Sequence, residues 1–144
     1  MQSGKSTEKM AKQLFLLLQT DLPDDAQVPK LKRERVSTEL LYLSMFLTDL
    51  AVYLTFRDTP ERSQLMERFW NLVSTAGLNM DVVGERMQAY SESSKAATKH
   101  EAFVQLGKTF AWHCLALGDD DIATLGEAAA ESHLEVLMTL LAES

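Results

Sequence analysis

The sequence contains few residues that stabilise a fold covalently and few that interrupt helices. Its 144 residues include one cysteine, Cys114, so no disulfide can form within the chain. Only three prolines and six glycines are present, and no segment shows the strict apolar/polar alternation of a half-buried β-strand. We therefore expect an all-α protein that is held together by its core.

Positive charge is also scarce, since 14 lysines and arginines face 21 aspartates and glutamates, for a net charge of −7. Nucleic acids and anionic lipid surfaces both attract basic surfaces, so we expect neither nucleic acid nor a membrane as partner. Residues 1–11 are polar, and the apolar run at residues 14–18 is too short for a signal peptide or a membrane span. These features predict a cytoplasmic protein.

Length and composition predict one folded unit. A chain of 144 residues with 46% hydrophobic residues can bury its own core. We expect a single helical domain over residues 1–144, with disorder at residues 1–5. Because the predicted loops are short, neighbouring helices should be antiparallel. The expected architecture is a compact bundle of five to six mostly antiparallel helices around a long central helix.

The predicted central helix covers residues 30–57 and is apolar on nearly every side, which is typical of a helix surrounded by other helices. Polar residues at 39, 44, 48 and 49 leave no run of about 18 apolar residues, so a membrane span is not predicted. Its main apolar stripe consists of Val36, Leu40, Leu43, Leu47, Leu50 and Leu54.

Capping residues predict the other helices. Thr59 and Pro60 suit the start of a helix that Gly77 would end. Further helices are expected at about residues 6–20, 79–90, 99–117 and 119–142. Glycines at positions 84, 107 and 126 fall inside predicted helices and indicate close helix–helix approach, or a ligand held against bare backbone.

Motifs for phosphate, metal or thiol chemistry are incomplete. Residues 4–7, Gly-Lys-Ser-Thr, lack the upstream glycine and strand of a phosphate-binding loop. None of His100, His113 and His133 follows a glutamate by three positions, as helical di-metal sites require. His113 and Cys114 are adjacent on a helix and point about 100° apart, which suits no thiol–imidazole pair. We predict no metal and no cofactor.

Asp49 is the leading candidate for a ligand-binding residue. It shares a helical stripe with Tyr42 and Tyr53, and a carboxylate among rings needs a partner. It would anchor a ligand or act as a general base in an aromatic pocket; the favoured alternative is a structural hydrogen bond to a residue of another helix. Tyr42 and Tyr53 are further candidate ligand anchors, as are His113 and His133 on apolar faces. For the two histidines a structural role is the favoured alternative.

Two charged clusters are candidate partner-binding surfaces. The basic cluster at the start of the central helix consists of Lys30, Lys32, Arg33 and Arg35. It would bind an acidic partner or a phosphate, although a solvated helix end is the simpler interpretation. A row of glutamates, Glu127, Glu131 and Glu135, marks the last helix, and no lysine or arginine follows Lys108. An acidic face can complement a basic cluster on a second copy, which predicts a homodimer or other homo-oligomer.

The leading functional hypothesis is a non-enzymatic helical interaction or regulatory protein that self-associates. Seven methionines and eleven aromatic residues (two Trp, three Tyr, six Phe) suit an adaptable apolar surface. The alternative is a binder of a small apolar or aromatic ligand in the bundle interior. A third hypothesis is an enzyme whose catalytic residues converge only in the folded chain.

Overall fold

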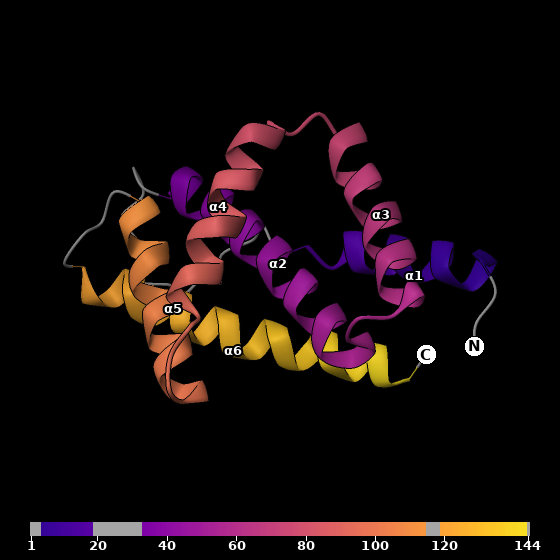
Figure 1. Ribbon diagram of the computed structural model, residues 1–144. Coiled ribbons are helices and arrows are strands. Elements are labelled where there is room, and N and C mark those ends of the chain that lie inside the picture. Colours follow the sequence, from indigo (N-terminus) through magenta and orange to yellow (C-terminus); the bar gives the residue numbers. More distant parts are fainter. Residues whose placement is uncertain (1–3, 19–32, 115–118, 144) are drawn as a thin grey trace.

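The computed structural model describes residues 4–18, 33–114 and 119–143, with side chains from Thr7 onward (Figure 1). Every regular element in these ranges is a helix, which confirms the all-α prediction. The helices are α1 (Gly4–Leu16), α2 (Arg33–Phe56), α3 (Pro60–Thr75), α4 (Met80–Ser93), α5 (Lys99–His113) and α6 (Asp120–Ala142). Of the segment 1–5 predicted to be disordered, residues 1–3 lie outside the described part, and α1 begins at Gly4.

The long central helix is confirmed as α2, which crosses the middle of the molecule and contacts α3, α4, α5 and α6 (Figure 1). Within the described ranges, α2 alone is long and apolar enough to cross a membrane by length and composition. In the apolar 18-residue stretch of α2 that meets this criterion, 61% is buried inside the molecule. The core helix of a soluble bundle has the same properties, and this burial is compatible with one.

Local capping explains where the helices begin. The Thr59 hydroxyl accepts a hydrogen bond from the backbone N–H of Arg62 at 3.4 Å, and Pro60 opens α3. Gly77, with φ +85°, follows α3 in the left-handed conformation expected of glycine. The Asp119 carboxylate caps α6 by accepting from two backbone N–H groups. By contrast, α5 ends at His113, before the predicted end at residue 117, and residues 115–118 lie outside the description.

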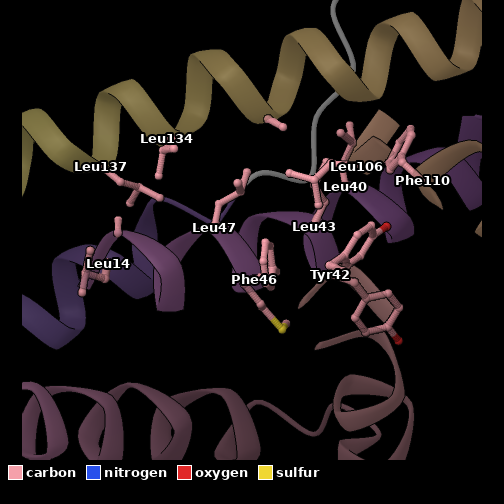
Figure 2. Close-up of a cluster of buried hydrophobic side chains, with 14 of the residues drawn as sticks. Leu14, Leu40, Tyr42, Leu43, Phe46, Leu47, Leu106, Phe110, Leu134 and Leu137 are labelled. Carbon is pink, nitrogen blue, oxygen red and sulfur yellow. The ribbon is translucent and has the colours of Figure 1, made fainter. Parts of the chain in front are cut away.

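The core lies where α2 meets its neighbours (Figure 2). Leu43 and Leu47 of α2 are 1% exposed, and Leu137 of α6 is fully buried. Leu14 of α1 and Phe110 of α5 complete the cluster from two further helices. Burying each such side chain contributes about 1.5–3 kcal/mol, so the leucine stripe recognised in the sequence is the main cohesive element.

Two glycines allow α5 and α6 to touch. A Cβ atom on Gly107 would collide with the carbonyl oxygen of Ala123, and one on Gly126 would lie 2.6 Å from the Phe110 ring. The predicted close approach is therefore confirmed at both positions. It is wrong for Gly84, which is exposed and would place its Cβ atom in open space.

Candidate functional site

A large concave surface lies between α5 and α6. The two helices touch at Gly107 and Gly126 and cross at a steep angle (Figure 1). The first half of α5 therefore diverges from the second half of α6, and the end of α2 forms the floor between them. We call this opening the α5–α6 groove.

The α5–α6 groove has a volume of about 1200 Å³ and is open to solvent. Ordinary small-molecule pockets have volumes of roughly 300–1000 Å³ and enclose most of the ligand. This opening is larger and less enclosed, and its lining is mainly apolar. The main apolar residues are Leu50 and Leu54 of α2, Phe103 and Leu106 of α5, and Leu134 and Met138 of α6.

The two edges of the groove carry charges of opposite sign. Lys99 and His100 stand on the α5 edge, and Glu131 and Glu135 stand on the α6 edge; all four are exposed. Among the described residues, ion pairs join other groups, in α2, α4 and the start of α3. The charged edges are thus available to groups on another molecule.

The five residues predicted to bind a ligand lie among three different sets of neighbours. The Arg86 guanidinium carbon lies 5.5 Å from the centre of the Tyr42 ring. The centres of the His113 and Tyr90 rings are 6.0 Å apart. Asp49 and Tyr53 instead face Arg62 of α3, and the His133 side chain is buried on α6. None of the five lines the α5–α6 groove.

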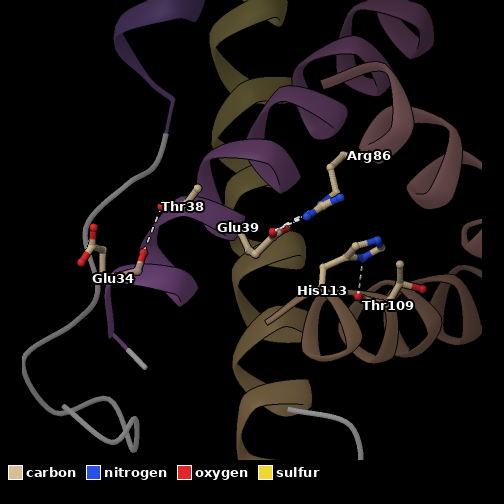
Figure 3. Close-up of polar contacts among 6 residues, drawn as sticks. All are labelled: Glu34, Thr38, Glu39, Arg86, Thr109 and His113. Atoms are coloured by element: carbon tan, nitrogen blue, oxygen red, sulfur yellow. Dashed lines mark hydrogen bonds and ion pairs between the residues drawn. The ribbon is translucent and has the colours of Figure 1, made fainter. Parts of the chain in front are cut away.

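The most buried carboxylate of α2 is Glu39, which the sequence analysis did not select. Its side chain is 3% exposed, and Arg86 of α4 grips it with Nη2–Oε1 at 2.8 Å and Nε–Oε2 at 2.9 Å (Figure 3). Such a two-pronged pair satisfies both charges and fixes α4 against α2. A carboxylate in a mostly apolar helix was the sequence signal that could have identified Glu39. Its partner could not be identified from sequence, because Arg86 lies 47 residues further along the chain.

Beside this pair lies the Tyr90 ring, which is fully buried. Burial, reinforced by the Glu39 carboxylate, holds the pKa of the Tyr90 hydroxyl well above its ordinary value. This tyrosine therefore stays protonated at neutral pH and is unsuited to act as a base. The ion pair joins α2 to α4, and the centre of the Tyr90 ring lies 5.9 Å from that of Phe46 in α2 and 6.0 Å from that of His113 in α5.

Asp49 is only partly buried, and burial raises the pKa of its carboxyl while the Arg62 guanidinium lowers it. Arg62 also pairs with Asp58 at 3.3 Å and stands 4.9 Å from the Tyr53 ring centre. A second guanidinium, of Arg57, lies 5.4 Å from the same ring. Arg62 is therefore the positive charge that acts on Asp49, but among the described residues no hydrogen bond or ion pair joins the two side chains, so the predicted structural hydrogen bond of Asp49 is not observed.

The two candidate histidines have different surroundings. The Nδ1–H of His113 donates to the Thr109 carbonyl oxygen at 2.9 Å, one helical turn earlier (Figure 3). His133 is 8% exposed, and burial lowers the pKa of its imidazole. The Nε2 atom of His133 is also buried and has no hydrogen-bond partner among the described residues.

Of the basic cluster, Lys30 and Lys32 lie outside the described residues. Arg33 and Arg35 occupy the first turn of α2, where Arg35 is exposed. From the acidic row, Glu131 and Glu135 lie on the edge of the α5–α6 groove. The structure therefore connects the acidic row, but not the described part of the basic cluster, with the groove.

Across the described residues, no three His, Cys, Asp or Glu side chains converge in a way that would hold a metal ion. What the chain offers is an open apolar groove with one basic and one acidic edge. This arrangement can bind an apolar stripe flanked by charges. Comparisons with protein-family models, with curated proteins and with solved structures found no match, so function is inferred from this geometry.

Proposed function

We propose that this chain is a non-enzymatic helical interaction protein that binds a helix of a protein partner in the α5–α6 groove. The observation that carries the proposal is the groove itself. It is an open space of about 1200 Å³ between diverging helices, and its lining is mainly apolar. Amphipathic helices bind in grooves of this kind through apolar residues at successive helical turns.

The dimensions of the groove suit a helix. Along α6 it runs over residues 131–142, a length of about 16 Å at a rise of 1.5 Å per residue. That length corresponds to about three helical turns. Met138 lines it and can adapt to an irregular partner surface because its side chain is unbranched and flexible.

A small enclosed ligand is supported less well. Small-molecule sites bury most of the ligand and place a few polar groups inside the cavity. Here the charged residues stand on the edges, and the predicted polar anchors Asp49, His113 and His133 belong to other parts of the bundle. A helix with an apolar stripe and flanking charges fits this distribution better.

The proposal includes a cytoplasmic location. The single cysteine, Cys114, is buried and has no second cysteine in the chain with which to form a disulfide. This usage is typical of proteins that work in a reducing compartment.

Photo-crosslinking in cells tests the proposed function. The crosslinking amino acid p-benzoylphenylalanine replaces Thr139, an exposed residue that lines the groove. The matched control carries it at Glu67, an exposed residue of α3 away from the groove. We expect one or a few discrete protein adducts from position 139, and none of these adducts from position 67.

Two results would contradict the proposal. Equal labelling from both positions would mean that the groove has no selectivity for proteins. The absence of protein adducts at position 139, together with a small molecule that copurifies with the chain, would favour the ligand-binding alternative.

A further inference from the structure

We infer that the α5–α6 groove is occupied by a second copy of this chain, in a two-fold symmetric dimer. The inference rests on the proposed function, because it names the partner whose helix enters the groove. The entering helix is the second half of α6, which forms the acidic edge of the groove in its own molecule.

The first argument is the sign of the charges on the two edges. In a two-fold dimer, a contact between residue i and residue j occurs twice, once in each direction. The acidic edge with Glu131 and Glu135 then meets the partner copy's basic edge with Lys99, and the reverse contact forms as well. Had both edges carried the same sign, self-association would have been repulsive.

The second argument is that Lys99, Glu131 and Glu135 form no ion pair with any residue that the structure describes. In the described ranges, the ion pairs are Glu39–Arg86 and Asp58–Arg62, away from the groove. Lys99 also occupies the first turn of α5, where the helix dipole is positive. A carboxylate that approaches this turn gains from both the ammonium group and the dipole, whereas a basic partner is repelled by both.

The third argument is shape. Because α5 and α6 touch at Gly107 and Gly126 and then diverge, each molecule presents an open angle with the groove inside it. Two such angles can interlock, so that one arm of each molecule lies in the opening of the other. The α6 arm that borders the groove carries the half-buried Met138, which would meet the apolar floor of the second copy, and Leu134 lies buried beneath it.

Sedimentation equilibrium of the full chain tests the inference. We expect the wild-type chain to reach twice the 16.1 kDa mass of one copy. Lys99→Glu should weaken the dimer about tenfold, because it turns an attraction into a repulsion at two symmetry-related contacts. Combining Lys99→Glu with Glu131→Lys and Glu135→Lys exchanges the edges and should restore most of the affinity.

Lys108→Glu is the matched control, since it makes the same charge change on an exposed residue of the same helix. Nine residues separate it from Lys99, which puts it on the opposite face of α5 at about 100° per residue. It should leave the dimer unchanged. Met138→Glu tests the floor independently of the edges and should abolish the dimer while circular dichroism still shows a folded helical chain.

Each further outcome is decisive. A wild-type chain that stays monomeric, a dimer that survives Met138→Glu, or an affinity that Lys99→Glu leaves unchanged overturns the inference. If the chain is monomeric but position 139 crosslinks to a different protein, the second copy is rejected and the proposed function stands. If the chain is monomeric and position 139 gives no protein adduct, both are rejected.

Discussion

Replacing glycine by alanine at positions 84 and 107 should change stability in opposite directions, although both residues lie inside helices. Alanine is favoured over glycine in a helix by about 1 kcal/mol, because glycine loses more backbone freedom on folding. At Gly84 the added Cβ atom meets nothing within 4 Å. Gly84→Ala should therefore raise the free energy of unfolding by about 0.5–1 kcal/mol.

At Gly107 the same atom collides with the backbone carbonyl oxygen of Ala123 and lies 3.0 Å from the backbone nitrogen of Glu127. Backbone atoms of α6 cannot rotate away as a side chain can, so the two helices must separate. Overpacking of this kind costs about 1–3 kcal/mol, which outweighs the gain in helix propensity. We expect Gly107→Ala to lower stability by about 1–2 kcal/mol.

Urea unfolding followed by far-ultraviolet circular dichroism measures both variants against the wild-type chain. The midpoints should move in opposite directions at an unchanged dependence on denaturant, since neither change alters the surface exposed on unfolding. A Gly107→Ala variant as stable as Gly84→Ala would refute the close crossing of α5 and α6, and with it the divergence that opens the groove.

Three further predictions concern ionisable residues that are buried or half-buried. Arg86→Met should cost about 3–5 kcal/mol in urea unfolding because it strands the Glu39 carboxylate, and most of the loss should return in the double variant with Glu39→Leu; additive losses would contradict the pair. Burial raises the pKa of Asp49, so the folded chain holds that proton more tightly than the unfolded chain. The contribution of Asp49 to stability should therefore rise as pH falls towards 3.8. Asp49→Asn should be more stable than wild type at pH 7, and this advantage should shrink as pH falls; a less stable variant would show a favourable carboxylate. Burial lowers the pKa of His133, so the contribution of His133 to stability should be full above about pH 6.5 and fall below it. Thermal melts of His133→Leu at pH 7.5 and pH 5 should show less acid sensitivity than wild type, and equal sensitivity would place the effect elsewhere.

Much of the fold was predictable because its signals are local. Thr59, Pro60 and Gly77 act on the backbone next to them, and α3 lies between them as predicted. The leucine stripe of α2 repeats with the helical period and therefore identifies the buried helix from sequence. The end of α5 was predicted less well, because no strong signal marks the backbone after His113.

The buried charge of α2 was harder to predict because that helix is apolar on nearly every side. In such a helix the sequence predicts that a carboxylate is buried, but it does not identify the residue of another helix that the carboxylate contacts. Asp49 was selected for its aromatic stripe, yet Glu39 is the more deeply buried residue, and Arg86 pairs with it from another helix. Only the crossing of α2 and α4 brings these two residues together.

The groove could not be predicted from sequence, because it arises from the angle between two helices. Glycines inside helices gave a partial signal, which was right at Gly107 and Gly126 and wrong at Gly84. Glycine in a helix can mark a contact or an exposed position, and the distinction depends on what packs beside it. The row Glu131 and Glu135 was visible in sequence, but its place on a groove edge was not.

Native mass spectrometry of the purified full chain tests the central claim most directly, because it weighs whatever fills the groove. The account predicts a protein complex, with a mass of twice 16.1 kDa for the wild-type chain and a single chain mass for Met138→Glu. A single 16.1 kDa chain that carries a small molecule, lost on denaturation and also lost in Met138→Glu, would contradict it.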